Sequence, residues 1–435
     1  MARSREFWNS LWQAFNPSEV LVGQRSHDLY CERSHEPFKG LLNKFAFSAP
    51  SVRPPITFFT GHRGSGKSSL LFRLLERFRD DYFVVYFDIE HNLDSGKANH
   101  LDLLYLLGIS IFQVAVREGV NPDPRHLQAL AESIYSITHE TKEKVKDQSL
   151  NIVELTKDVL CFGASMFGAA LGEKLAQAVL NPFSMTSGVS EEVARKRETE
   201  PRVQEIITHV NLIITDVQTK VKKNLLVIVD GLDKLPQLEQ AELIFFDSRA
   251  LSGPLCRIIY TVPMLIFSDP RFAQVEEEGG AYFLSNVKLY DREDDSLRDE
   301  EGYAFLREVV RKRLHSVPLA PEDVFAPEVL DLLITKSGGV MRWFIGLVQD
   351  ACLMAAGMEL DTVNREAAQQ AIDDRVAKLT GRLTRETVAE LQAVRKSKWP
   401  SNSKESGLLL HGLLIVAYRN QRTWFDAHPL VWEVL

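Results

Sequence analysis

The run from residue 56 to residue 75 constrains the fold of this chain more than any other stretch. Residues 56–60 predict a buried strand, and residues 70–75 predict a helix. Between them, Gly61, Gly66, Lys67 and Ser68 fit the pattern G-x-x-x-x-G-K-[ST]. Glycines let successive backbone N–H groups turn toward phosphate oxygens, and a helix N-terminus adds its positive end. The stretch therefore predicts a phosphate-binding loop between a strand and a helix.

Each position of this loop has an expected task. Lys67 is expected to reach the β- and γ-phosphates, and Ser68 to ligate Mg²⁺. The sequence thus implies ATP and Mg²⁺ as cofactors. The candidate nucleotide-binding residues are Gly61, His62, Arg63, Gly64, Ser65, Gly66, Lys67, Ser68 and Ser69.

A second stretch, residues 224–230, predicts a central strand that ends in Asp230. An aspartate at such a strand end holds Mg²⁺ next to Ser68, which is Walker B chemistry. Asp233 follows three residues later. It is a candidate for activating the hydrolytic water or for binding the metal indirectly. A purely structural turn acid remains the alternative for Asp233.

Further candidates for the reaction are spread along the chain. Thr261 ends the strand predicted at residues 255–262 and is a candidate to contact the γ-phosphate or the attacking water. Arg342 begins a helix after two glycines, so it either reaches the γ-phosphate from a helical lid or is a surface residue behind a helix C-cap. Arg249 is an arginine finger or a partner in a surface ion pair.

Two acidic positions and one histidine stay open between a functional and a structural interpretation. Asp88 and Glu90 end the strand predicted at residues 82–90. They either orient a water or contact Mg²⁺ indirectly at the ligand edge of the sheet, or they are loop acids that cap a helix. His428 either senses a β-phosphate or is a packed histidine.

Composition sets the broad class. A chain of 435 residues suggests two or three domains, and 45% hydrophobic and 25% charged residues are typical of a soluble globular protein. Four widely spaced cysteines argue against a zinc site or a disulfide framework and favour a cytoplasmic protein. The apolar run at residues 159–172 is shorter than the ~20 residues that a membrane span needs, so no stable span is expected.

The predicted fold class is α/β, with a three-layer P-loop NTPase core of the ASCE type, a helical lid and a C-terminal winged-helix-like domain. The predicted domains are a lead-in at residues 1–50, a P-loop core at 51–290 with a helical insertion at about 95–220, a helical lid at 291–376, and a helix followed by a β-hairpin at 377–435.

Four segments of the chain carry a family resemblance. The loop at residues 61–68, together with Val229-Asp230-Gly231-Leu232-Asp233-Lys234, resembles the STAND branch of AAA+-related ATPases, and its Asp-Gly-Leu-Asp form is similar to NACHT modules. Those modules often carry Glu where this chain has Lys234, which implies slow hydrolysis. Residues 261–263 and 337–342 resemble segments of origin-recognition-type AAA+ proteins. In those proteins the arginine that corresponds to Arg342 serves as sensor 2. The resemblance covers roughly residues 20–95 and 220–435.

This resemblance implies an ATP-gated switch that forms a homo-oligomer or engages a separate effector protein, and bacterial relatives work in anti-phage defence. One alternative is an ATPase that loads on DNA. It is not favoured, because the net charge is −8 and the last 60 or so residues have few clustered basic side chains. Another alternative is a nucleotide-binding scaffold with little turnover.

Overall fold

The computed structural model describes residues 3–33, 38–47, 54–89, 100–142, 192–235, 238–246, 250–277, 280–401 and 403–435. The chain divides into two compact units. Unit 1 consists of residues 1–42, 61–76 and 283–435, and unit 2 consists of residues 43–60 and 77–282. The predicted insertion segment at residues 159–172 lies outside the described residues.

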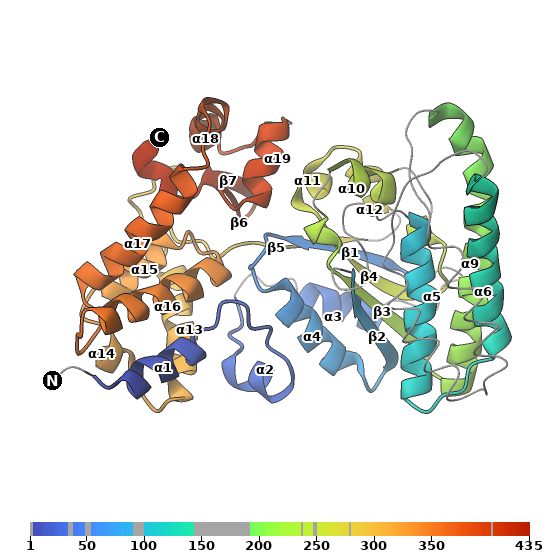
Figure 1. Ribbon diagram of the computed structural model, residues 1–435, viewed down its shortest axis with the longest axis horizontal. Helices are drawn as coiled ribbons and strands as arrows, with labels where there is room; N and C mark the ends of the chain where they lie inside the picture. Colours follow the sequence, from blue (N-terminus) through green and yellow to red (C-terminus); the bar gives the residue numbers. More distant parts are fainter. Residues whose placement is uncertain are drawn as a thin grey trace. The chain divides into compact units, whose positions relative to one another are not determined.

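A five-stranded sheet forms the centre of the α/β core (Figure 1). Its order is β2-β3-β4-β1-β5, and the described registers of β2 with β3, β3 with β4, and β4 with β1 are parallel. The strand that ends in Asp230 is thus separated from the strand before the phosphate loop by one strand, which is the ASCE order and confirms the predicted fold class. The strands are β1 (Ile56–Gly61), β2 (Tyr82–Asp88), β3 (Asn224–Asp230), β4 (Arg257–Val262) and β5 (Ala281–Leu284).

The sheet is buried on both faces, which explains why its strands are continuous apolar runs rather than alternating ones. Val227, Val229 and Ile258 point to the face that carries the main core of unit 2. Ile228 and Ile259, which alternate with them, are fully buried on the opposite face. Both faces of the sheet are therefore covered, as a three-layer fold requires.

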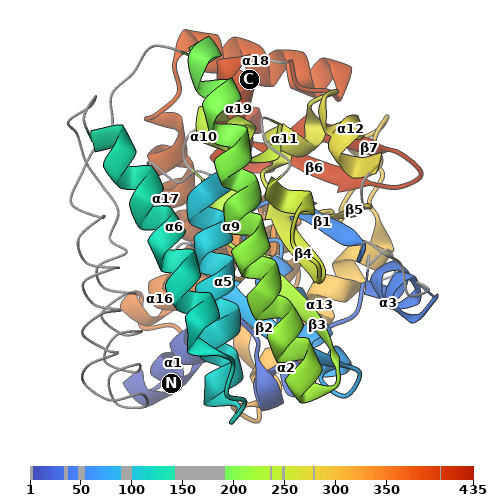
Figure 2. The same cartoon turned by 90° about the vertical axis from the view of Figure 1, so that its right-hand side faces the viewer.

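Long helices cover the sheet of unit 2. The helices α5 (His100–Arg117), α6 (Pro124–Lys142) and α9 (Glu192–Val221) run side by side and pack on one another (Figure 2). Among the described helices, α5 alone has the length and hydropathy of a membrane span, but 67% of it is buried inside the protein. Its contacts with α9 and β2 identify it as a core helix. The shorter elements are α10 (Leu238–Phe245), α11 (Met264–Ser268), α12 (Phe272–Glu277), η2 (Leu232–Lys234) and η3 (Ala250–Ser252).

A second core lies in unit 1, where N-terminal residues pack against a helical segment from much later in the chain. Trp8, Leu11 and Phe15 belong to the same buried cluster as Leu306 and Leu347. This later segment is helical, as the lid in the predicted fold class is. Its helices are α13 (Glu300–His315), α14 (Pro321–Val324), α15 (Val329–Lys336), α16 (Met341–Gly357) and α17 (Arg365–Thr380). The N-terminal helices of this unit are α1 (Arg5–Ala14) and α2 (Gly23–Leu29). Two other helices are α3 (Phe38–Phe47) and α4 (Lys67–Phe78), which follows the phosphate loop.

The C-terminal part of unit 1 contains two helices followed by an antiparallel hairpin, as predicted. The chain leaves the helical conformation near Gly381 and begins a new helix at Arg385. The new helix begins there because Thr384 and Thr387 form a reciprocal capping box. The elements are α18 (Arg385–Ser397), α19 (Lys404–His411), β6 (Ile415–Arg419), β7 (Thr423–Ala427) and η4 (Pro429–Val434).

Candidate functional site

The phosphate loop connects β1 to α4 through a turn that two glycines make possible. Gly64 and Gly66 have φ values of 77° and 100°, a region that residues with a side chain rarely adopt. The N–H of Ser65 donates to the carbonyl of His62 at 3.1 Å, and the N–H of Leu70 donates to Gly66 at 3.0 Å. The motif therefore folds into a tight turn that leads directly into the helix.

The ammonium group of Lys67 lies over the start of this loop. Its Nζ donates to the carbonyls of Gly61 at 2.7 Å and His62 at 2.9 Å, and the residue is only 5% exposed. Ser68 is half-buried in the first turn of α4. The hydroxyl of Ser69 accepts a hydrogen bond from the N–H of Leu21 at 3.1 Å, so its side chain binds the N-terminal segment.

His62 connects the loop to the C-terminal hairpin. Its Nε2 accepts a hydrogen bond from the N–H of Ala417 at 2.9 Å, and burial lowers its pKa to about 3, with the charge of Lys67 acting in the same direction. The imidazole is therefore neutral at physiological pH. Because the His62 side chain is hydrogen-bonded to Ala417, the predicted role of His62 in nucleotide binding is left to its backbone N–H group. Arg63, next in the loop, is half-buried.

The predicted sensor arginine begins the helix that meets the loop. The N–H of Arg342 donates to the carbonyl of Gly64 at 3.0 Å. A side chain at Gly64 would collide with Arg342, so the glycine permits this close approach. Upstream, Gly338 and Gly339 adopt positive φ values of 58° and 70° as they end α15. The pair of glycines therefore acts as a C-cap and also brings Arg342 to the phosphate loop.

Of the two interpretations of His428, a phosphate sensor or a packed histidine, the structure favours the packed histidine. It is fully buried, its Nε2 donates to the carbonyl of Ser337 at 3.0 Å, and its Nδ1 accepts from the N–H of Leu430 at 3.2 Å. Burial lowers its pKa to about 3. Both ring nitrogens are thus engaged in holding the turn before Arg342.

Unit 2 contributes an acidic row at the carboxyl edge of the sheet. Asp88 and Asp230 are directly paired in the register of β2 and β3. The Oδ2 of Asp230 accepts from the hydroxyl of Tyr86 at 2.9 Å, and its Oδ1 accepts from the N–H of Gly231 at 2.8 Å. Burial raises the pKa of Tyr86, and the charge of Asp230 raises it further, so the phenol stays protonated and donates. The Nζ of Lys234 lies 3.3 Å from Asp88.

Thr261 and Asp233 complete this edge. Thr261 follows Tyr260, which pairs with Val229, so it stands level with Asp230. Thr261 is fully buried and its hydroxyl donates to the carbonyl of Val229 at 3.4 Å. Asp233 is 8% exposed within η2. The predicted catalytic residues of unit 2 therefore gather at one edge of the sheet.

The donor types at this edge fit magnesium. No three His, Cys, Asp or Glu side chains gather into a metal cage within the described ranges. Mg²⁺ is commonly held by one or two carboxylates together with substrate phosphates, so a complete protein cage is not required. Asp230, the carboxylate that the sequence predicted as a ligand, lies at this edge.

Sequence reasoning missed two residues and named two that fall outside the described part of the chain. Tyr86 was missed, although strand alternation places it on the same face of β2 as Asp88. Arg33 was missed because no motif marks it, yet its guanidinium donates to the carbonyl of Ser65 in the phosphate loop. Glu90 and Arg249 lie outside the described residues.

Comparisons with known proteins give no family assignment. No protein-family model matches the chain, and no curated protein matches it. The chain is similar to the solved structure of Drosophila ORC bound to DNA, with 11% identity, 98% of this chain and 91% of the other covered, and a TM-score of 0.41.

Two further solved structures resemble the chain. The Aeropyrum pernix ORC1 protein in complex with DNA has 13% identity, 98% coverage of both chains and a TM-score of 0.39. A RuvB variant from Thermotoga maritima has 11% identity, 52% and 82% coverage, and a TM-score of 0.26. At these TM-scores the similarities carry no inference about function, and the fold assignment rests on the strand order described above.

Proposed function

We propose that this chain binds and hydrolyses MgATP and acts as an ATP-gated switch of the AAA+ type. One observation carries the proposal. The strand before the phosphate loop and the strand that ends in Asp230 belong to one sheet, with β4 between them. Parallel strands bring their carboxyl ends to the same edge, which is where open α/β sheets bind ligands.

The chain's own groups divide the work. The amides of the phosphate loop and Lys67 bind the phosphates, while Asp230 and Ser68 bind Mg²⁺, which when bound neutralises phosphate charge. The Tyr86 hydroxyl fixes the orientation of the Asp230 carboxylate. Asp233 orients the water that attacks the γ-phosphate. Lys234 pairs with Asp88 and is not an acid, which favours slow turnover.

Contacts within unit 1 support the switching part of the proposal. The phosphate loop is hydrogen-bonded to the N-terminus of α16 through Gly64 and to β6 through His62. A nucleotide that reshapes the loop therefore acts directly on both the helical lid segment and the C-terminal hairpin. We propose that the resulting closed form self-associates or engages a separate effector protein, as in a defence or signalling assembly.

The direct test is ATP binding by a Lys67→Ala variant. Loss of a buried, hydrogen-bonded charge that contacts the phosphates is expected to weaken MgATP binding by about 100-fold or more. Lys396→Ala, which changes an exposed lysine of α18, is the matched control and should bind like the unmodified chain. Calorimetry measures both. Unchanged affinity in Lys67→Ala, or no ATP binding by the unmodified chain, would refute the proposal.

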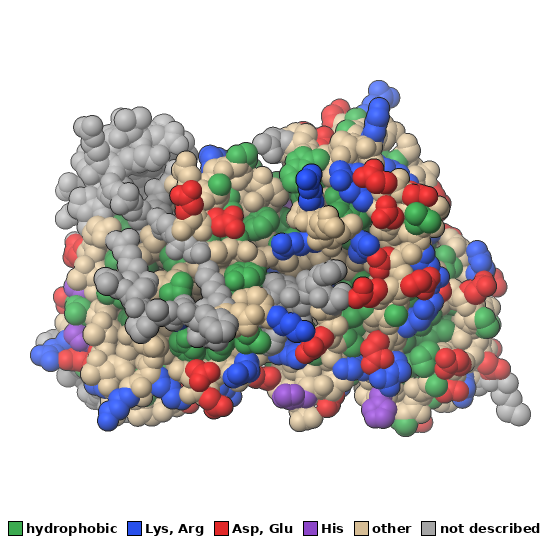
Figure 3. All heavy atoms as spheres, turned by 180° about the vertical axis from the view of Figure 1, so that it is seen from behind, with side chains coloured by type: hydrophobic (Ala, Val, Ile, Leu, Met, Phe, Trp, Pro, Cys, Tyr) green, Lys and Arg blue, Asp and Glu red, His purple; other side chains and the backbone are tan. Residues whose placement is uncertain are grey.

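DNA binding is a second candidate function, and the C-terminal hairpin favours it. Residues 377–435 carry nine Lys and Arg against five Asp and Glu, whereas the whole chain has a net charge of −8. Arg419 and Arg422 are exposed at the tip of the hairpin. Against this candidate, basic and acidic side chains are interspersed on the face drawn in Figure 3 and form no large patch of one sign there.

Duplex binding at several salt concentrations tests this second candidate. If the hairpin contacts DNA, replacing both Arg419 and Arg422 by alanine should weaken binding and lower the slope of log affinity against log salt by about 2. Arg382→Ala, an exposed arginine that precedes α18, serves as the control. A salt dependence that the double variant leaves unchanged would exclude the hairpin as the DNA contact.

A further inference from the structure

We infer that Arg33 supplies a second cation for the phosphates of the nucleotide, from the N-terminal segment that precedes the sheet. The inference rests on the proposed function and deepens it, because it adds a residue of unit 1 to the phosphate site. It is independent of the P-loop motif, since Arg33 lies 28 positions before Gly61 and belongs to no recognised pattern.

Arg33 bridges the phosphate loop and the segment that follows β5. Its Nη2 donates to the carbonyl of Ser65, and its Nη1 donates to the carbonyl of Ser285 at 2.6 Å. A Cβ added at Gly66 would lie 3.7 Å from Nη2, so the guanidinium lies against the turn that precedes Lys67. The cation is therefore held beside the amides that would receive the phosphates.

The charge of this guanidinium is not neutralised within the described part of the chain. No described carboxylate forms an ion pair with Arg33, and both of its hydrogen-bond partners are neutral carbonyls. Burial lowers the pKa of Arg33 to about 10, so the group remains positively charged at neutral pH. A guanidinium has five N–H donors in a planar fork, which suits phosphate oxygens. A buried, uncompensated cation of this kind favours an anionic ligand.

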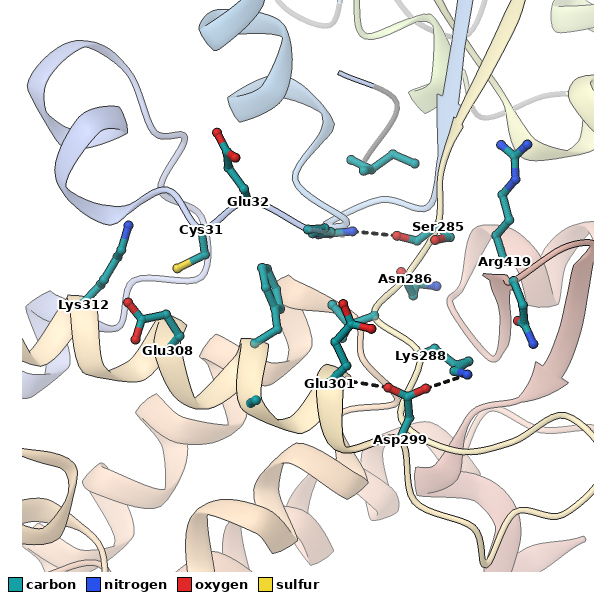
Figure 4. A pocket seen from close by; sticks show the side chains of 17 residues that line it. Cys31, Glu32, Ser285, Asn286, Lys288, Asp299, Glu301, Glu308, Lys312 and Arg419 are labelled. Carbon is teal, nitrogen blue, oxygen red and sulfur yellow. Dashed lines mark hydrogen bonds and ion pairs between the residues drawn. The ribbon is translucent and has the colours of Figure 1, made fainter. Parts of the chain in front are cut away.

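A pocket provides the space for such a ligand. It has a volume of about 500 Å³ and lies within unit 1, where Arg33, Ser285 and Phe305 line it (Figure 4). The Cζ of Arg33 lies 5.7 Å from the centre of the Phe305 ring. The lining residue Lys288 is paired with Asp299 at 2.5 Å, in contrast to Arg33. Glu32, Glu301 and Glu308 also line the pocket, but none of them forms an ion pair with Arg33, whose guanidinium lies where the pocket meets the phosphate loop.

Arg33 could instead serve only as a structural tie between two carbonyls, and two substitutions separate these roles. Arg33→Gln keeps an N–H donor for a carbonyl but removes the charge. Arg33→Lys keeps the charge. A phosphate contact is expected to weaken in Arg33→Gln by about tenfold and to be largely retained in Arg33→Lys, because charge-assisted hydrogen bonds are the stronger ones.

The ligands used for the test are MgATP and inorganic tripolyphosphate with Mg²⁺, each measured by calorimetry at low and high salt. We expect Arg33→Gln to weaken both ligands equally and the loss to shrink at high salt. The control is Lys312→Gln. Lys312 is a second cation of the same pocket, donates to the carbonyl of Tyr30 at 2.6 Å, and lies away from Ser285 in Figure 4. Thermal melting without nucleotide verifies that each variant folds.

Three results would overturn the inference. The first is an equal loss of affinity in Arg33→Gln and Arg33→Lys, and the second is a loss of ATP affinity in Arg33→Gln that tripolyphosphate does not share. The third is an Arg33→Gln variant that binds both ligands as tightly as the unmodified chain. The failure of the proposed function looks different. In that case the unmodified chain binds neither ligand, or Lys67→Ala binds both normally. If Lys67→Ala abolishes binding while Arg33→Gln leaves it intact, ATP binding stands and only the role of Arg33 falls.

Discussion

Asp88 and Asp230 end neighbouring parallel strands at the same register, so two carboxylates stand next to each other at one edge of the sheet. Two like charges this close repel each other unless other groups offset them. Lys234 offsets Asp88, and the hydroxyl of Tyr86 satisfies Asp230. The lysine that occupies the position of the expected acid therefore pairs with Asp88 in this chain. Under the proposed function, the water-activating role belongs to Asp233, and Asp88 is the alternative.

Paired substitutions assign that role. Asp233→Asn is expected to bind ATP normally and to hydrolyse it about 10² to 10⁴ times more slowly, because a positioned acid or base contributes a factor of this size. Asp88→Asn is the matched control and should retain turnover. ATP binding and phosphate release are measured for both variants. A loss of turnover in Asp88→Asn alone would transfer the role to the β2 carboxylate.

His62 and His428 make unit 1 sensitive to acid. Burial lowers the pKa of both to about 3, against about 6.5 for the unfolded chain. Between these values the unfolded state binds more protons than the folded state, so stability is complete above pH 6.5 and is lost as the pH falls toward 3.

The size of this effect can be measured with one variant. Each histidine should contribute a slope of about 1.4 kcal/mol per pH unit to the free energy of unfolding between pH 6 and pH 4. His428→Asn should be less stable at pH 7. The slope of its free energy of unfolding against pH should be smaller by about 1.4 kcal/mol per pH unit, which corresponds to one proton. Denaturant titrations at several pH values check this. An identical slope in the variant would mean that His428 titrates normally in the folded protein.

At the scale of elements, the turn between α15 and α16 is fixed by close backbone packing. The N–H of Val287 donates to the carbonyl of Gly339 at 3.0 Å, and a Cβ on Gly339 would overlap the carbonyl of Val287. The same turn receives the hydrogen bond from His428. These contacts set the start of α16, and the start of α16 sets where the N–H of Arg342 meets the phosphate loop.

Gly339→Ala should therefore destabilise unit 1 and weaken ATP binding together. The expected loss of stability is about 3 kcal/mol or more, since a positive φ and a backbone clash combine. Gly23→Ala is the matched control. Gly23 also has a positive φ, of 52°, but a Cβ there would meet no atom within 4 Å, so only the backbone cost of about 1 to 2 kcal/mol is expected. Comparable losses in the two variants would show that the contact with Val287 carries no energy.

At the scale of the whole molecule, the proposed switch predicts that nucleotide state controls assembly. Light scattering after size exclusion, with ATP, with ADP and without nucleotide, is expected to show a larger particle, or a partner-bound one, with ATP only. Asp233→Asn, which retains ATP, should hold that state longer than the unmodified chain. One particle size under all three conditions, with and without partner, would leave a nucleotide-binding scaffold as the better description.

The sequence by itself determined the local elements and the identity of the phosphate loop. Buried strands and amphipathic helices follow from side-chain periodicity. Glycines in the loop permit the tight turn, in which Gly64 and Gly66 adopt positive φ values. Asp230 could be placed at a strand end because it directly follows a run of apolar residues. These features depend on neighbours within a few residues.

Only the tertiary structure decided what each of these groups contacts. It showed that Tyr86 binds Asp230, that Arg33 binds Ser65 in the loop, and that the imidazole of His62 serves the hairpin rather than a ligand. In each case the two partners are separated by tens to hundreds of residues, and their meeting depends on how whole elements pack. Local pattern carries no information on such contacts, because the burial and hydrogen bonding that create them exist only in the folded chain.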